Sequence, residues 1–147
     1  MHDIQTARIE VSAGSEQNAF AGMMAELIRS NLHDHPEKRQ DFALMHGRVA
    51  LVAEDAETVV TLHFRGGELR VHSGMLGVPD LVVRGSSAAL IDLSRIPKHP
   101  RFGFLPDPRA DVVRELARAI YDRKLRVHGL LANLRLGVRL SRVLSIY

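Results

Sequence analysis

The stretch Thr61-Leu-His-Phe-Arg-Gly-Gly-Glu-Leu-Arg-Val71 decides the fold, because apolar and polar side chains alternate on both sides of Gly66-Gly67. Alternation with a period of two is typical of β-strands, and two adjacent glycines suit the two-residue turn of a hairpin. The pairing sets Phe64 opposite Leu69 and Leu62 opposite Val71, on an apolar face that also holds Val60. The other face carries Thr61, His63, Arg70 and His72. The sequence therefore predicts an antiparallel sheet with one covered and one wet face.

The segments around this hairpin alternate between strand and helix patterns. We expect strands over 48–54, 58–65, 68–73, 80–84 and 124–128, because apolar residues recur there with a period of two. A helix over 16–32 is expected behind an N-cap at Ser15. Further helices are expected from Pro36, with Phe42, Leu44 and Met45 buried, then after Ser86 or Ser87, and over 111–123 and 130–145. The order predicts an α+β fold, with a five-stranded, mostly antiparallel sheet and helices covering one face.

Length and composition favour one domain. The 147 residues leave room for a single core, with 1–14 as an N-terminal arm and 15–147 as the domain. Cysteine is absent, which excludes a disulfide framework and thiolate metal sites. The start resembles no signal peptide, and no apolar run approaches the ~20 residues of a spanning helix. We therefore expect a soluble cytoplasmic protein, with peripheral membrane contact as an option.

Charge divides the chain into two halves. Residues 1–64 carry a net charge of −5, and residues 65–147 carry +8. Such polarity suggests a surface that meets anions, either phospholipid headgroups or nucleic acid. The basic segment has almost no interleaved aromatic side chains for base stacking, which argues against nucleic acid. A solvated helix face explains the arginines equally well.

Motifs for catalysis or metal binding are missing. The sequence contains no Gly-x-Ser-x-Gly elbow, no phosphate-binding glycine loop and no nucleophile–base pair that stands out. His33, His35 and His46 lie near one another in sequence, and His63 and His72 share a strand face. Zinc needs three or four converging ligands, so we expect no metal, no cofactor and no enzyme.

The final helix has more apolar surface than a core requires. Arg135, Arg139 and Arg142 lie at i, i+4 and i+7 and form one stripe. Leucines and valines occupy most of the remaining circumference, whereas a surface helix needs only a narrower apolar stripe. The excess predicts that this helix covers a cavity, a partner or a membrane, with the three arginines facing an anionic membrane surface.

Four stretches of the chain resemble the sterol carrier protein type of lipid-binding domain. They are Gly47-Arg-Val-Ala-Leu-Val, the hairpin quoted above, Pro79-Asp-Leu-Val-Val-Arg-Gly and Lys124-Leu-Arg-Val-His-Gly-Leu-Leu-Ala-Asn-Leu. The resemblance spans about residues 16–146 and implies an apolar tunnel between sheet and helices. It also implies binding of sterols, fatty acids or other lipids. The proline-rich loop 96–108 looks longer than usual, and Leu130 stands where an acidic residue often follows the glycine, so a sterol preference does not carry over.

Function follows from the resemblance and the apolar pattern together. We expect a lipid-like apolar ligand in the tunnel, for carriage or presentation. The predicted ligand-binding residues are Met23, Met24, Leu27, Phe42, Leu62, Phe64, Leu69, Val71, Phe102, Phe104, Ile120, Leu134 and Val138. The alternatives are an accessory protein that holds a lipid for a biosynthetic enzyme complex, and a ligand-free scaffold that forms a homodimer.

Overall fold

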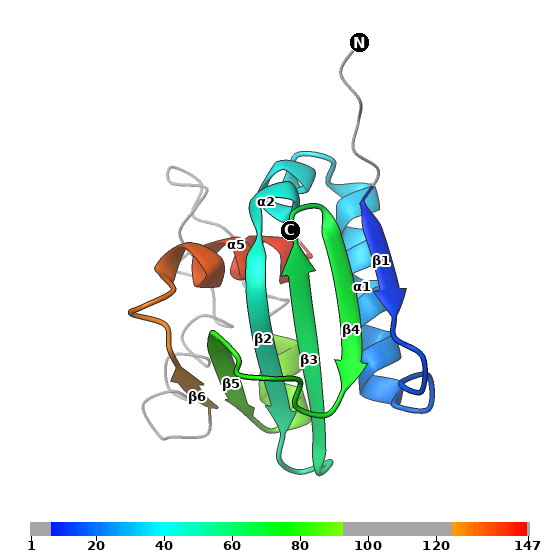
Figure 1. Ribbon diagram of the computed structural model, residues 1–147, viewed down its shortest axis with the longest axis vertical. Coiled ribbons are helices and arrows are strands. Elements are labelled where there is room, and N and C mark those ends of the chain that lie inside the picture. Colours follow the sequence, from blue (N-terminus) through cyan, green and yellow to red (C-terminus); the bar gives the residue numbers. More distant parts are fainter. Residues whose placement is uncertain (1–6, 93–124, 147) are drawn as a thin grey trace.

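The computed structural model describes residues 7–92 and 125–146 and places one six-stranded sheet in front of a layer of helices (Figure 1). The strands are β1 (Arg8–Val11), β2 (His46–Ala53), β3 (Thr58–Arg65), β4 (Glu68–Ser73), β5 (Leu81–Gly85) and β6 (Leu125–His128). The helices are α1 (Ala19–Asp34), α2 (Lys38–Leu44), α3 (Ser87–Asp92) and α5 (Leu134–Leu144). The predicted α+β class is confirmed. The predicted loop 96–108 and helix 111–123 lie outside the described residues.

The sheet has the order β1-β4-β3-β2-β5-β6. The predicted hairpin register is confirmed, since Phe64 pairs with Leu69 and Leu62 with Val71. Gly66 and Gly67 both have positive φ angles, 58° and 90°, which the tight turn requires.

The prediction of five strands was wrong by one strand. Residues 8–11, expected to belong to an arm, form the edge strand β1, which pairs parallel with β4. A second parallel pair, β2 with β5, lies inside the sheet, so the sheet is mixed. Four residues with only Ile9 and Val11 facing inward give little periodic signal, and the pairing depends on a partner about 60 residues away.

Helix α1 begins later than predicted. Asn18 is its N-cap, and its side-chain oxygen accepts hydrogen bonds from the amides of Phe20 and Ala21, at 3.1 and 3.2 Å. The hydroxyl of Ser15, the predicted cap, instead accepts a hydrogen bond from the Ser73 amide at the end of β4. Ser15 is therefore engaged in a tertiary contact and does not cap α1, although the local sequence suggested that it would.

The connection from β4 to β5 crosses the front of the sheet, as Figure 1 shows. We call residues 74–79 the strap. The Thr61 hydroxyl donates to the carbonyl of Gly74 at 2.7 Å and accepts from the amide of Leu76 at 3.0 Å. The strap therefore lies over β3, which explains why Thr61 and Ala50 are fully buried although their side chains point away from the helices.

Asp80, directly after the strap, joins three parts of the fold. Its amide and carboxylate bond to the backbone of Arg48 in β2, and its carbonyl accepts from the Asn133 side chain at the start of α5. Gly129 packs against the same carbonyl with a φ of 86°, and an added Cβ would lie 2.3 Å from it. Only glycine fits there.

The core lies between the sheet and the helices. Its largest apolar members include Ile28, Phe42, Leu51, Leu62, Phe64, Leu69, Leu81 and Leu125. Leu44, which was predicted to be buried, is more than half exposed. Within the described segments, no helix is both long and apolar enough to cross a bilayer.

Candidate functional site

Helix α5 packs behind the sheet through Leu136, Leu140, Val143 and Leu144. Its C-terminal carbonyls, which lack partners within the helix, are satisfied by side chains of other elements. Asn31 donates to the carbonyls of Val143 and Leu144, both at 2.9 Å. The buried ammonium of Lys38 donates to the carbonyl of Ser145. A positive charge is favourable at this end of a helix, so α5 is fixed firmly against α1 and α2.

An apolar pocket of about 130 Å³ opens between α5 and the strands β5 and β6. It is lined by Leu81, Val83, Val127, Leu130, Gly137, Leu140, Ser141 and Leu144. The hydroxyl of Ser141 donates to the Val138 carbonyl at 2.7 Å, so the one polar side chain among these residues has a partner within its own helix. The pocket therefore offers apolar contacts and little specific polar recognition.

Gly137 is the lining residue that has no side chain. A Cβ at Gly137 would lie 2.6 Å from Leu130 Cδ1 and 3.8 Å from Leu81 Cδ1. Any larger side chain would extend between the helix and β5. The absence of a side chain at this position therefore leaves room for the Leu130 side chain and for the pocket in front of Leu81.

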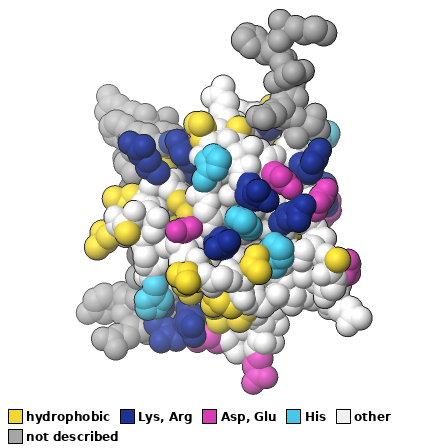
Figure 2. Space-filling view, viewed as in Figure 1, with side chains coloured by type: hydrophobic (Ala, Val, Ile, Leu, Met, Phe, Trp, Pro, Cys, Tyr) yellow, Lys and Arg dark blue, Asp and Glu magenta, His cyan; other side chains and the backbone are white. Residues whose placement is uncertain are grey.

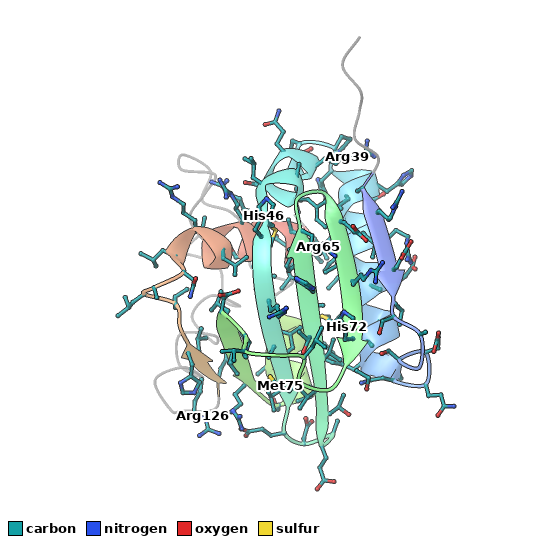
Figure 3. The ribbon with its side chains drawn as sticks, in the orientation of Figure 1. Arg39, His46, Arg65, His72, Met75 and Arg126 are labelled. Carbon is teal, nitrogen blue, oxygen red and sulfur yellow. The ribbon has the colours of Figure 1, made fainter. Side chains whose placement is uncertain are left out.

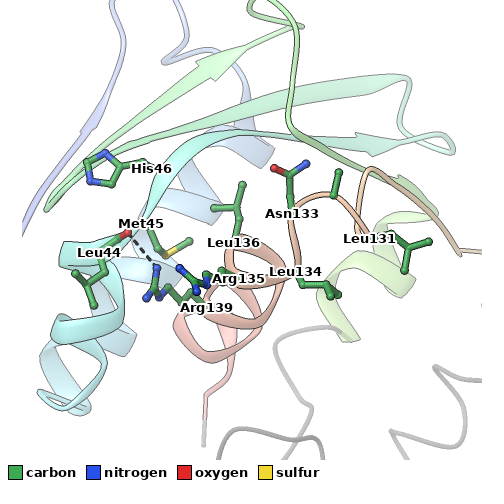
Figure 4. A pocket seen from close by; sticks show the side chains of 10 residues that line it. Leu44, Met45, His46, Leu131, Asn133, Leu134, Arg135, Leu136 and Arg139 are labelled. Atoms are coloured by element: carbon green, nitrogen blue, oxygen red, sulfur yellow. Dashed lines mark hydrogen bonds between the residues drawn. The ribbon is translucent and has the colours of Figure 1, made fainter.

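A second, wider cleft of about 450 Å³ lies at the other end of α5 (Figure 4). Its lining mixes apolar, basic and amide side chains: Leu44, Met45, His46, Leu131, Ala132, Asn133, Leu134, Arg135, Leu136 and Arg139. Arg139 Nη1 donates to the Leu44 carbonyl at 3.3 Å, the dashed line in Figure 4. Leu131 and Leu134 are 90% and 52% exposed, so this cleft has a wet, partly apolar rim.

The three predicted membrane-facing arginines have different surroundings. Arg142 forms an ion pair with Asp41 at 3.0 Å, and Arg139 is bonded to the end of α2. Arg135 is exposed, and no partner for it exists among residues 7–92 and 125–146. The stripe exists as predicted, but two of its three guanidinium groups hold α2 and α5 together. Its membrane role stays a prediction.

Six of the ten predicted ligand-binding residues in the described segments lie in the packed core. Leu62, Phe64, Leu69 and Val71 are each at most 1% exposed. Phe42 covers Phe64 edge to face, with ring centroids 6.1 Å apart. Met24 is buried and Leu27 is half-buried on α1, whereas Met23 points outward and is 41% exposed.

Of the predicted apolar residues that the structure describes, only Leu134 lines either pocket, and it lines the wider cleft. Val138 is half-buried on α5. Phe102, Phe104 and Ile120 lie outside the described residues. The ligand-binding role of all these residues stays a prediction.

Sequence reasoning missed the residues that line the apolar pocket. Two signals were available: the alternation within Leu81–Gly85 and Leu125–His128, and a glycine inside an otherwise amphipathic helix. An isolated glycine in a helix costs stability and marks close packing or function.

The described histidines lie in several parts of the fold. Within the described residues, no three His, Asp or Glu side chains are placed to hold a metal ion. His63 and His72 lie on the wet face of the sheet, where burial lowers the pKa of both imidazoles. Nearby arginines, Arg48 and Arg70 among them, lower these pKa values further. Both rings therefore favour the neutral form.

Comparison with known proteins yields structural likeness only. No family model and no curated protein matches the sequence. Among solved structures, the chain is similar to UbiJ-SCP2, described as a ubiquinone synthesis protein, with a TM-score of 0.57 and 18% identity. That match covers 85% of this chain and 94% of that structure.

Two sterol carrier structures give similar agreement. Sterol carrier protein 2 matches with a TM-score of 0.52 and 14% identity, covering 84% of this chain and 92% of that one. The sterol carrier protein domain 2 of Helicoverpa armigera matches with a TM-score of 0.52 and 16% identity, covering 91% of each. Identities this low carry information on architecture alone. The chain therefore has the fold of sterol carrier protein 2.

Proposed function

We propose that this protein binds an apolar lipid-like ligand in the pocket between β5, β6 and α5, and carries or presents it. The single observation behind the proposal is an apolar pocket that stays open because Gly137 has no side chain. An engineered apolar cavity of about 150 Å³ stays dry and binds benzene. A pocket of about 130 Å³ therefore suits a segment of an acyl or isoprenoid chain.

Affinity would come from apolar burial. Each methylene removed from water contributes about 0.8 kcal/mol, offset by the entropy lost on binding. Because the one polar side chain of the lining is bonded within its own helix, we expect little selectivity for headgroups. The fold, shared with sterol carrier protein 2, is consistent with this proposal.

Titration with a fluorescent fatty acid tests the proposal. The wild type should saturate near one probe per chain, and Gly137→Leu should weaken binding at least tenfold, because the new side chain occupies the pocket. Gly22→Leu is the matched control: it makes the same substitution on a helix, at a position with nothing within 4 Å of an added Cβ. Wild-type affinity in Gly137→Leu, or no saturable binding of any fatty acid, sterol or isoprenoid, would contradict the proposal.

A second candidate is an accessory role, in which the protein holds an isoprenoid lipid for biosynthetic enzymes. The observation that favours it is the likeness to a ubiquinone synthesis protein over 94% of that structure. Displacement of the fluorescent fatty acid separates the two functions. An isoprenoid quinone that displaces the probe at much lower concentration than a fatty acid supports the accessory role, and equal potency supports the general carrier.

A further inference from the structure

The face of the sheet that points away from the helices is strongly basic within the described residues. We call it the outer face. Strand alternation directs six arginines onto it and two glutamates, within the described residues: Arg8, Arg48, Arg65, Arg70, Arg84 and Arg126 against Glu10 and Glu68. His63, His72 and His128 point the same way. Figure 2 shows this face, where arginines and histidines gather across the middle and apolar side chains lie below them.

Basic side chains lie directly opposite one another on this face. Arg48 in β2 is in register with His63 in β3, which is in register with Arg70 in β4. Arg84 in β5 is in register with Arg126 in β6. Like charges directly opposite across strands destabilise a sheet. The pair of Arg84 and Arg126 therefore costs stability in the free protein, and an anionic partner would reduce that cost. His63, which favours the neutral form, adds little charge between Arg48 and Arg70.

The acidic groups nearby neutralise only part of this charge. Glu68 lies 3.4 Å from Arg70, Glu10 is in register with Arg70, and Glu54 pairs with Arg126 at 2.5 Å. The carboxylate of Asp80 accepts from the backbone amide of Arg48.

Four arginines of the outer face have no carboxylate partner within the described residues. Among residues 7–92 and 125–146, no carboxylate lies within 4.0 Å of the guanidinium groups of Arg8, Arg48, Arg65 or Arg84. The Nε of Arg48 is buried and has no hydrogen-bond partner there. The outer face therefore carries unneutralised positive charge.

The strap adds apolar side chains to the outer face. Met75, Leu76 and Val78 are 48%, 38% and 83% exposed, and Figure 3 shows Met75 on the strap in front of the sheet, not far from His72. The strap backbone is bonded to Thr61 and Val59. These apolar side chains therefore belong to a strap that is held against β3, and arginines of the sheet lie on both sides of it.

From this arrangement we infer that the outer face docks on a lipid bilayer that contains anionic lipid. The strap residues would enter the boundary between headgroups and acyl chains. The arginines would lie at the headgroup level, with their apolar stems along the surface. A nucleic acid fits less well, because the described phenylalanines, Phe20, Phe42 and Phe64, lie on the helix side of the sheet and offer no stacking platform.

This surface is distinct from the α5 stripe, and it is independent of the ligand pocket. Two of the three α5 arginines are held by Asp41 and Leu44, whereas four arginines of the outer face have no carboxylate partner in the described part of the chain. Charge complementarity therefore favours the outer face as the membrane contact.

Sedimentation with vesicles of phosphatidylcholine, with and without phosphatidylserine, tests the inference. Each basic residue near an anionic surface is worth about a fivefold change in partitioning. Arg65→Gln with Arg84→Gln should therefore weaken binding to the anionic vesicles about 25-fold. The matched double variant Arg135→Gln with Arg139→Gln makes the same charge change on α5 and should change binding less than about twofold. Val78→Ser should weaken binding at low and at high salt, because its contribution is apolar.

Three results would overturn the inference: no binding to anionic vesicles, equal binding to neutral ones, or a larger loss in the α5 double variant. If the outer face binds an acidic protein instead of a bilayer, the first result is expected, and the protein will not bind anionic vesicles. Thermal unfolding serves as the folding check, and Arg84→Gln should not lower the midpoint, since it removes the repulsion with Arg126. Fatty acid titration of Arg65→Gln with Arg84→Gln should match the wild type, so failure of the docking surface and failure of the ligand pocket are distinguishable.

Discussion

Asn31 is the residue through which α1 holds the C-terminal end of α5, and replacing it with alanine tests how α5 is fixed. One side-chain nitrogen donates to the carbonyls of Val143 and Leu144, both at 2.9 Å. Each buried acceptor left without a partner costs about 1–3 kcal/mol. Because both carbonyls lose their donor, we expect Asn31→Ala to lower the free energy of unfolding by about 2–4 kcal/mol.

Urea and thermal unfolding followed by circular dichroism measure this loss. At this chain length, each kcal/mol lowers the midpoint by about 2–4 °C, so the midpoint should fall by roughly 5–15 °C. Asn31→Asp keeps the shape but cannot donate when ionised, and it should cost at least as much. Asn18→Ala, which removes the cap of α1, is the comparison and should cost about 1 kcal/mol. A loss in Asn31→Ala no larger than in Asn18→Ala would refute the reasoning.

Three further predictions concern packing and pH. Gly129→Ala should lower the free energy of unfolding in urea by several kcal/mol, because its Cβ would lie 2.3 Å from the Asp80 carbonyl. An unchanged free energy of unfolding would show that the backbone of this turn can shift to accept the new side chain. Leu62→Ala should cost about 2–5 kcal/mol yet leave fatty acid affinity unchanged, whereas lost affinity at unchanged stability would place the ligand at the hairpin. Stability should fall as the pH drops below about 6.5, because His63 and His72 have lowered pKa values in the fold and the unfolded chain then binds more protons. Replacing both histidines with Gln should flatten this slope in unfolding curves at several pH values, and an unchanged slope would contradict the assignment.

The parts of the fold that could be predicted depend on local pattern. The hairpin at Gly66-Gly67 has alternation, turn residues and register in one short stretch, and the structure reproduces it. The parts that were missed depend on distant partners. Strand β1 needs β4 beside it, and the true N-cap of α1 is known only once Ser15 has bonded to Ser73.

The position of the Lys38 side chain also depends on a distant partner and could not be predicted from the local sequence. A lysine in a polar stretch predicts a surface position, yet it is 1% exposed. Its ammonium lies at the C-terminal end of α5, where it bonds to the carbonyl of Ser145. Since more than 100 residues separate the two, no local pattern could have revealed the contact.

The candidate site was harder to predict than the fold for a physical reason. The strongest apolar pattern, Leu62 to Val71, marks where packing is tightest, and Phe42 fills the space over Phe64. A pocket forms where packing is incomplete, and that depends on a missing side chain, Gly137, opposite Leu81. Hydrophobic periodicity reports which residues are buried, but it does not report where they leave room.

Photolabelling with a fatty acid that carries a diazirine in its chain tests the central claim most directly. After irradiation, the labelled peptides are mapped by mass spectrometry, with and without an excess of unlabelled fatty acid. We predict labels, suppressed by the competitor, on peptides of β5, β6 and α5 that contain Leu81, Val127 or Leu140, and their loss in Gly137→Leu. Labels confined to peptides that contain Leu62 or Leu69, or labels that the competitor does not suppress, would contradict the account.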